Sequence, residues 1–341
     1  MSAPAEPDTF NVGIVGVGLL GRVIGTQLLS RPDASVVAIT DVSDGARAEG
    51  GEELSVPEDS RYEEYETMLD TEDLDGVVIT TPHAFHYGQI SAAFDRGLHV
   101  LCEKPLVLDV DEAIELRNRA ADLELTLMVG FQRHQDSSFV KARDRYRNGG
   151  PEIEFITAEI TQPWFDSFGG TWRTDVDLSG GGFLVDTGRH VVDAMLWVTG
   201  LNPVAVTAEM TYWDEGVDDT AVLSIEFENG ATASVSVYGD APAVREAHHI
   251  WDEEGAAYVE GRGWGGREFT SIDSDGTEHS LLLDRGQERN KADAFMDAVH
   301  TDAEPPATAT DAIRATAVIT AAYEAATTGE RVEIVLPDDA Q

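Results

Sequence analysis

The chain has 341 residues, 42% of them hydrophobic, and its 64 acidic and 23 basic residues give a formal net charge of −41. This length predicts two domains, and the hydrophobic fraction is sufficient for sizeable cores. Nucleic acid and anionic membranes are poor partners for such a chain, because both are themselves negatively charged. The acidic residues are scattered along the whole chain, which favours a hydrated surface suited to high salt, as in halophilic archaea, over an acidic mimic of nucleic acid.

The first residues offer neither the basic region nor the apolar core of a signal peptide, and no long apolar run follows them. We therefore expect a cytoplasmic protein. The single cysteine, Cys102, excludes an intramolecular disulfide and a cysteine-based zinc cluster, so we interpret it as a buried thiol and expect no metal.

An apolar strand beginning at Val12 leads into the pattern Gly16-x-Gly18-x-x-Gly21, and an amphipathic segment, 22–29, follows. The first glycine permits a tight turn, the second lets a pyrophosphate approach the backbone, and the third lets helix and strand pack closely. The N-terminus of the helix then faces the phosphates. The predicted cofactor contacts of this turn are Gly16, Val17, Gly18, Leu19 and Leu20.

A second apolar strand, 36–41, ends at Asp41, which lies 20 residues after Gly21. A carboxylate at this point accepts hydrogen bonds from both ribose hydroxyls and repels a 2′-phosphate, which favours NAD over NADP. Arg47 is close enough in sequence to soften that preference, so NADP stays possible. The Gly/Glu/Ser-rich stretch 44–60 is interpreted as an exposed acidic connection.

Strands at 74–81, 98–102 and 125–131 alternate with helices at 84–96 and 109–123. This alternation predicts a doubly wound parallel sheet, an NAD(P)-binding Rossmann domain over residues 1–132. Ligands of such sheets collect at the carboxyl ends of the strands. The further cofactor contacts predicted there are Thr80, Thr81, Pro82, His83, His86, Glu103, Lys104 and Gln132. His83 and His86 are equally compatible with a structural role, as helix caps.

Lys104 is one of only three lysines in the chain, and it follows a predicted strand at the cofactor edge. Near a bound sugar, its ammonium group can donate hydrogen bonds and favour a developing alkoxide. An ordinary Glu-Lys pair at a strand end is the alternative interpretation.

After Phe131 the pattern changes, and residues 133–341 are predicted to form an α+β domain with a large, mostly antiparallel open sheet. Strands are expected at 154–162, 204–213, 220–227 and 231–238, with a hairpin turn at Asn229-Gly230. His248 and His249, adjacent on a strand, point to opposite faces and are interpreted as structural.

The run from Gly180 to Asp193 places Asp186 and His190 one helical turn apart, with Asp193 on the same face. The carboxylate and the imidazole are a candidate acid/base pair. The opposite face is apolar and is expected to pack in a core. A solvated surface helix is the alternative.

These motifs, in this order and spacing, resemble the glucose-fructose oxidoreductase/inositol dehydrogenase/MocA family. They are the glycine turn with Asp41, the segment 81–86, Glu103-Lys104-Pro105, the run 130–133, and Gly-Gly-Gly-x-x-x-Asp-x-x-x-His at 180–190. His83 departs from the pattern, because many members carry Asn there. The final helix, 310–328, and the strand 331–335 also look like the ending of the family.

The resemblance implies NAD(P)-dependent hydride transfer to or from a carbon of a sugar, polyol or related hydroxy compound, by a homodimer or homotetramer. His190 would remove the hydroxyl proton, Asp186 would orient the imidazole, and Lys104 would hold the reacting oxygen. The candidate substrate contacts are Lys104, Arg133, Trp164, Trp172, Arg173, Asp186 and His190, with Asp193. A core aromatic or a surface ion pair is the alternative for several of them. A redox-assisted NAD-dependent glycosidase and a non-catalytic dinucleotide or sugar sensor remain open as functions.

Overall fold

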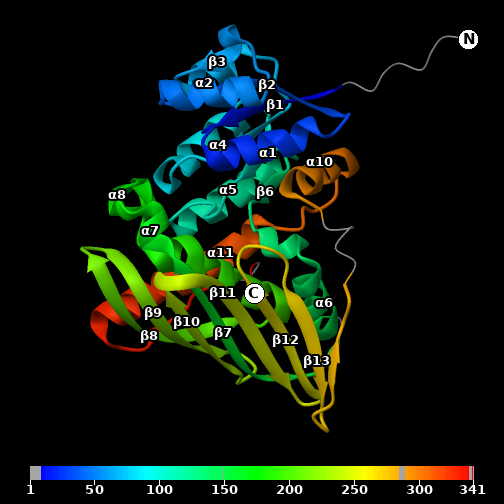
Figure 1. Cartoon of the computed structure of the whole chain (residues 1–341), viewed down its shortest axis with the longest axis vertical. Coiled ribbons are helices and arrows are strands. Elements are labelled where there is room, and N and C mark those ends of the chain that lie inside the picture. Colours follow the sequence, from blue (N-terminus) through cyan, green and yellow to red (C-terminus); the bar gives the residue numbers. More distant parts are fainter. Residues whose placement is uncertain (1–8, 148, 284–288, 338–339, 341) are drawn as a thin grey trace, which may run out of the picture. The chain divides into compact units, whose positions relative to one another are not determined.

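The computed structural model describes residues 9–147, 149–283, 289–337 and 340 (Figure 1). The chain forms two compact units. Residues 9–107, 111–130 and 289–309 make up the first, and residues 108–110, 131–283 and 310–337 belong to the second. The prediction that all of 133–341 lies in the second domain is therefore wrong for residues 289–309.

The first unit is the predicted doubly wound α/β fold. Its parallel six-stranded sheet has the order β3-β2-β1-β4-β5-β6, the strand order of a Rossmann fold. The strands are β1 (Phe10–Val15), β2 (Ala34–Thr40), β3 (Arg61–Tyr62), β4 (Gly76–Ile79), β5 (His99–Cys102) and β6 (Leu127–Val129). The helices are α1 (Leu19–Leu29), α2 (Asp44–Glu53), α3 (Tyr65–Thr71), α4 (His86–Phe94), α5 (Val110–Asp122) and α10 (Lys291–Thr301), with short 3₁₀ turns at Glu58–Ser60 and His83–Phe85.

The segment 44–60 differs from the predicted exposed connection, because α2 occupies its first half. Ser43 caps this helix, its hydroxyl oxygen accepting from the backbone N–H of Ala46 at 3.3 Å. The helix packs through glycine instead of large apolar side chains: a Cβ on Gly50 would lie 2.3 Å from Val17 Cγ2. Because glycine makes this contact, α2 needs no periodic set of apolar side chains. Its sequence therefore shows no hydrophobic periodicity and resembles that of a loop.

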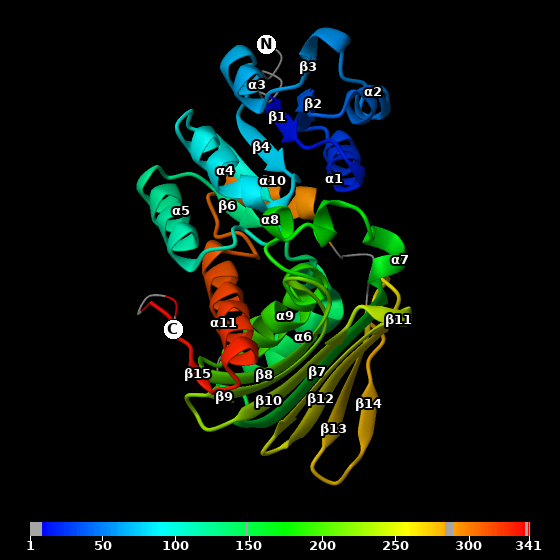
Figure 2. The same cartoon turned by 90° about the vertical axis from the view of Figure 1, so that its left-hand side faces the viewer.

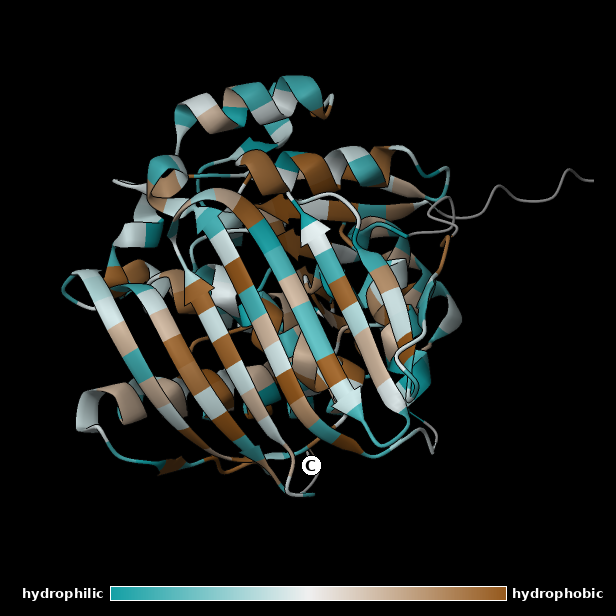
Figure 3. Ribbon diagram, turned by 60° about the horizontal axis from the view of Figure 1, so that its bottom comes forward, coloured by the Kyte–Doolittle hydropathy of each residue, from teal (hydrophilic) through white to brown (hydrophobic). Residues whose placement is uncertain are grey.

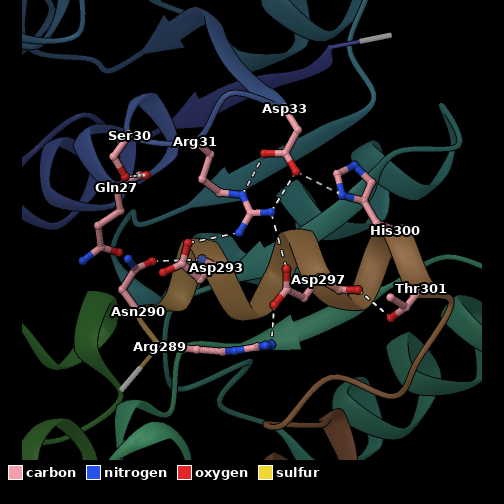
Figure 4. Close-up of polar contacts among 10 residues, drawn as sticks. All are labelled: Gln27, Ser30, Arg31, Asp33, Arg289, Asn290, Asp293, Asp297, His300 and Thr301. Atoms are coloured by element: carbon pink, nitrogen blue, oxygen red, sulfur yellow. Dashed lines mark hydrogen bonds and ion pairs between the residues drawn. The ribbon is translucent and has the colours of Figure 1, made fainter. Parts of the chain in front are cut away.

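Helix α10 joins the first unit through both its apolar and its charged residues. Its Ala292, Phe295 and Met296 are buried in the same core as β1 and α1. Arg31, which follows α1, contacts Asp33, Asp293 and Asp297 at 2.8, 3.1 and 3.4 Å (Figure 4). Two further ion pairs extend this Arg31 cluster, between His300 and Asp33 and between Arg289 and Asp297.

The second unit is the predicted α+β domain. Its nine-stranded sheet has the order β14-β13-β12-β11-β7-β10-β9-β8-β15, in which only the β7–β10 pair is parallel among the described pairs. The strands are β7 (Ile153–Pro163), β8 (Pro203–Asp214), β9 (Val217–Phe227), β10 (Thr232–Tyr238), β11 (Asp240–Asp252), β12 (Gly255–Arg262), β13 (Glu268–Asp273), β14 (Glu278–Ser280) and β15 (Val332–Glu333). The hairpin at Asn229-Gly230 joins β9 to β10 as expected. Of the strands that follow β10, the sequence pattern predicts the bounds of β15 alone.

One face of this sheet is covered by helices, and a large apolar core lies between them (Figure 2). The helices are α6 (Ser137–Tyr146), α9 (Arg189–Thr199) and α11 (Ala309–Thr328), and the shorter α7 (Trp164–Phe168) and α8 (Val176–Ser179) lie before α9 in sequence. The other face is open, and hydrophobic and hydrophilic residues alternate along its strands (Figure 3). Exposed apolar side chains of the sheet include Phe155, Val222 and Tyr238. Across the described residues, no helix is both long and apolar enough to span a membrane.

Candidate active site

The glycine turn of the first unit has the geometry that the spacing predicts. A Cβ on Gly21 would lie 2.2 Å from the carbonyl oxygen of Gly16, so only glycine fits this contact between α1 and the end of β1. In contrast, the described chain places no atom within 4 Å of the Cβ position of Gly18, which caps the N-terminus of α1. That space, at the positive end of a helix, suits a pyrophosphate group. The turn therefore fits a dinucleotide.

Side chains from two neighbouring strands hold this turn. The hydroxyl of Thr80, after β4, donates to the carbonyl oxygen of Gly16, at the point where the strand order reverses. The carboxylate of Asp41, after β2, accepts from the backbone N–H groups of Val17 at 3.1 Å and Ser43 at 2.9 Å. Arg47 donates to the carbonyl oxygen of Asp41, not to its carboxylate. Asp41 is thus beside the turn, where an adenosine ribose would need a carboxylate.

His86 is fully buried, so its expected cofactor contact is not direct in this structure. Its ring nitrogens lie 2.8 Å from the carbonyl oxygen of Pro105 and 3.0 Å from that of Thr81. Burial lowers the pKa of His86, and a neutral imidazole can donate to only one of these oxygens at a time. His86 connects the loops after β4 and β5, and the ring of the buried His83 packs against it at 5.9 Å.

Glu103 and Lys104 have different surroundings, although they are adjacent. The buried carboxylate of Glu103 accepts a hydrogen bond from Lys291 at the start of α10, within the first unit. Its oxygens also lie against Gly130, where a Cβ would come within 2.8 Å of Oε1. Glu103 therefore ties β5 and β6 to α10. Lys104 is half-buried and precedes Pro105 through a cis peptide bond.

In the second unit, an acidic side chain from the sheet caps the segment that carries the candidate acid/base pair. The carboxylate of Asp218, on β9, accepts from the backbone N–H groups of Gly182 at 2.8 Å and Leu184 at 2.7 Å, and from the hydroxyl of Tyr323. A Cβ on Gly182 would lie 2.2 Å from the carbonyl oxygen of Asp218, which explains the glycine. Burial raises the pKa of Asp218 and that of Tyr323.

Asp186 lies in a π-helical turn, Leu184–Gly188, that leads directly into α9 and His190. Such turns are frequent at functional sites. Its Oδ2 accepts from the indole N–H of Trp164 at 2.7 Å and forms an ion pair with Arg173 at 3.2 Å. Both Asp186 and His190 are buried, with 5% and 6% of their surface exposed. The candidate pair is consequently not on the solvated surface helix that was the alternative.

Arg173 is itself held in a stack. Its guanidinium carbon lies 4.4 Å from the ring centroid of Phe168 and 4.4 Å from that of Trp172. Trp172 and Arg173 are both half-buried, in the 3₁₀ turn Trp172–Thr174. This stack fixes the cation that faces Asp186.

Three predicted substrate contacts are buried in roles that the sequence did not indicate. Trp164 has no exposed surface, so it holds Asp186 in this structure and presents no ring face to a sugar. Arg133 is also fully buried, and two of its nitrogens donate to Glu246 at 3.2 and 2.7 Å. Asp193 accepts from His134 at 3.0 Å in the core. Gln132, just before Arg133, is half-buried.

Sequence reasoning missed Lys291, Asp218 and Trp264. Lys291 and Asp218 lack a motif, because their partners are far away in sequence: Lys291 pairs with a residue 188 positions earlier, and Asp218 with one 36 positions earlier. Trp264 lies in a glycine-rich connection, and an aromatic residue among glycines is the one signal that could have drawn attention to it.

Comparisons with known proteins agree with both units. A family model described as an oxidoreductase family with an NAD-binding Rossmann fold matches residues 10–131, and one described as a GFO/IDH/MocA C-terminal domain matches residues 139–257. D-xylose 1-dehydrogenase (NADP(+)) 2 of Haloferax volcanii is 28% identical over 336 residues, which cover 95% of this chain and 98% of that protein. D-glucoside 3-dehydrogenase of Escherichia coli is 27% identical over 255 residues, covering 67% and 70%.

Solved structures share the fold along nearly the whole chain. Levoglucosan dehydrogenase, in complex with NADH and levoglucosan, aligns with a TM-score of 0.85 at 20% identity, over 96% of this chain and 100% of that one. Aldose-aldose oxidoreductase from Caulobacter crescentus, complexed with glycerol, aligns with a TM-score of 0.82 at 24% identity, over 95% and 99%.

Proposed function

Because the chain belongs to the glucose-fructose oxidoreductase/inositol dehydrogenase/MocA family and is an NAD(P)-dependent oxidoreductase, we propose that its substrate is a sugar, polyol or related hydroxy compound. The observation that carries this proposal is the buried Asp186, which Trp164 and Arg173 hold within the second unit, with the buried His190 one helical turn later. A carboxylate and an imidazole in this arrangement suit the removal of a proton from a hydroxyl group.

We assign His190 as the general base. Its imidazole takes the proton of the substrate hydroxyl in the oxidative direction and returns it in the reductive direction. Asp186 orients that imidazole and stabilises its cationic form, and its own position is fixed by two donors. Lys104 donates to the reacting oxygen and favours its alkoxide form. The bound nicotinamide supplies the chemistry of hydride transfer.

The first unit would bind the dinucleotide through the glycine turn and Asp41. The open space beside Gly18 would take the pyrophosphate, and the carboxylate of Asp41 would accept from the ribose hydroxyls. We propose NAD as the preferred cofactor, since the guanidinium of Arg47 is bound to the carbonyl oxygen of Asp41 and to Asp44. With both contacts made, the guanidinium of Arg47 is not directed toward a 2′-phosphate.

We test the proposal by measuring NADH formation in molar KCl with a panel of aldoses, polyols, inositols and sugar acids, and with NADP in parallel. The expected result is turnover with NAD on one stereochemical class. Clear NADH binding without turnover on any member of the panel would contradict the dehydrogenase and support a sensor. Release of product from a glycoside without net NADH would support the glycosidase.

We also propose that the protein is a cytoplasmic homodimer or homotetramer that associates through the open face of the nine-stranded sheet. The exposed Phe155, Val222 and Tyr238 on this face support the proposal, because association would remove their apolar surface from water. Sedimentation of the wild type and of Val222→Glu tests it, with a monomeric wild type as the contradicting result.

A further inference from the structure

Trp264 is an exposed indole beside the candidate general base. It lies in the loop that joins β12 to β13, and 45% of its surface is accessible to solvent. Single exposed aromatic residues are common on protein surfaces, so the neighbours of Trp264 within the second unit carry the argument.

Two ring contacts define the position of Trp264. The indole centroid lies 6.4 Å from the imidazole centroid of His190, with the planes inclined at 67°. The guanidinium carbon of Arg133 lies 5.4 Å from the same indole. Because His190 and Arg133 are both buried, the exposed part of the indole extends from a position next to the proton-accepting group into solvent.

Arg133 provides the second, independent observation. Its Nε and Nη2 donate to Glu246, whereas its buried Nη1 has no hydrogen-bond partner in the part of the chain that the structure describes. An unsatisfied buried donor is unfavourable, so the oxygen of a ligand would be stabilising there. A donor and an aromatic ring, side by side, are the two groups that recognise the hydroxyls and the C–H faces of a sugar.

Two glycines flank Trp264 in this loop. Gly263 has a φ of +76°, a conformation that favours glycine. Among the described residues, neither Gly263 nor Gly265 has a non-neighbouring atom within 4 Å of its Cβ position, so the chain on both sides of the indole is open.

We infer that Trp264 is a substrate-contacting residue whose indole packs on the C–H face of a cyclic sugar or cyclitol, beside the unsatisfied Nη1 of the buried Arg133. This inference rests on the proposed function and narrows its substrate class. A ring presents a flat C–H face to the indole, whereas an open-chain polyol does not. Trp264 therefore favours cyclic substrates over linear ones.

The test compares the full-length wild type, Trp264→Ala and Trp264→Phe on the best cyclic substrate and on a linear polyol. Trp264→Ala should raise the KM for the cyclic substrate about tenfold, because the ring of the substrate loses the apolar surface on which it packs. The KM for NAD should stay within about twofold. Trp264→Phe should restore most of the affinity. Trp213→Ala is the matched control, because Trp213 is 55% exposed on β8.

Hydrogen exchange of residues 262–267, with NADH present, provides a readout that does not depend on turnover. Exchange should slow when the cyclic substrate is added. An active wild type whose KM is unchanged in Trp264→Ala overturns the inference, as does a change of oligomeric state without a change of KM, which would mean that a second copy covers the indole. A wild type that oxidises no substrate contradicts the proposed function. In that case, slower exchange of residues 262–267 with the cyclic sugar still supports the contact at Trp264, and unchanged exchange contradicts it.

Discussion

The side chain of Asp186 accepts from an indole and faces a guanidinium, both from its own unit. Neither partner can take up the hydroxyl proton of a substrate at neutral pH, since an indole N–H and a guanidinium are donors only. His190, one turn later and buried, is the group nearby that can. This is why we propose the imidazole of His190 as the general base.

His190→Ala should lower kcat by about 10²- to 10⁴-fold, the usual contribution of a general base. The Kd for NADH should be unchanged, because no predicted cofactor contact involves His190. Steady-state kinetics and NADH fluorescence titration measure the two quantities. His249→Ala, which changes a half-exposed histidine on β11, is the matched control. Equal losses in both variants would contradict the assignment.

Asp41→Ala should reduce the preference for NAD over NADP at least about tenfold, since the carboxylate that repels a 2′-phosphate is gone. The measurement is the ratio of kcat/KM with NAD to kcat/KM with NADP. A ratio is needed because loss of the hydrogen bond from the Val17 N–H weakens the binding of both cofactors. The control is Glu52→Ala in α2. It removes one negative charge, as Asp41→Ala does, from an exposed residue outside the glycine turn. A ratio that shifts equally in this control would mean that only net charge acts.

Residues defined by local spacing could be predicted from the sequence, and residues defined by a distant partner could not. The glycine turn, Asp41 and the Asp186 and His190 pair belong to short motifs. Trp164 and Arg133 were predicted as substrate contacts, and the sequence could not show that both are buried, because burial depends on segments that pack from far along the chain.

The segment that carries Asp186 and His190 depends on Asp218, a residue from another element. Asp218→Ala should lower the free energy of unfolding by about 3 kcal/mol, because it leaves the N–H groups of Gly182 and Leu184 without their charged acceptor. It should also lower kcat, since the segment that carries the proposed pair, Asp186 and His190, loses its anchor.

Chemical denaturation and steady-state kinetics measure both effects of the Asp218 variant. Asp219→Ala, the next residue on β9 and only half-buried, should change neither. Asp218→Asn keeps one acceptor oxygen and should be intermediate. Full activity and stability in Asp218→Ala would show that the cap is dispensable.

Arg31→Met should lower the free energy of unfolding by about 1 kcal/mol, a modest value because the carboxylates of the Arg31 cluster are partly exposed. Hydrogen exchange of α10 should become faster, since the cluster fastens this helix to the loop after α1 (Figure 4). Arg22→Met, which removes two surface ion pairs from α1, is the control and should leave α10 unchanged.

The same cluster predicts a pH effect. The hydrogen bond from Arg31 lowers the pKa of Asp33 below its ordinary 3.8, so the folded state favours the ionised carboxylate. The stabilisation is present above the unfolded pKa and is lost as the pH falls through the folded one. Unfolding free energies measured from pH 5 to pH 2 should therefore fall more steeply for the wild type than for Asp33→Asn. Parallel curves would contradict this.

Element types followed from periodicity, and the alternation of strands and helices predicted the six-stranded sheet. Helix α2 escaped prediction, because its packing uses glycine and its sequence is polar. The strands from β11 to β14 were not delimited either, since alternation is weak where an open face carries both aromatic and charged residues.

From the net charge of −41, we expect the stability of the whole molecule to depend on the salt concentration. Repulsion among carboxylates destabilises the compact state in low salt, while molar salt shortens the screening length from about 10 Å at 0.1 M to about 3 Å. We expect the Tm to rise substantially between 0.1 M and 2 M KCl, as measured by differential scanning calorimetry. An unchanged Tm would contradict a protein adapted to high salt.

Residues 289–309 belong to the first unit but follow most of the second unit in sequence, so the first unit is completed only late in translation. When residue 130 leaves the ribosome, the sheet is complete, but Glu103 still lacks Lys291 and Arg31 lacks two of its three carboxylates. At about 5–20 residues per second, synthesis of α10 is complete roughly 9–34 seconds later. Throughout that interval, the nascent nucleotide-binding unit exposes the apolar patch that α10 later covers, and this is when a chaperone would be needed.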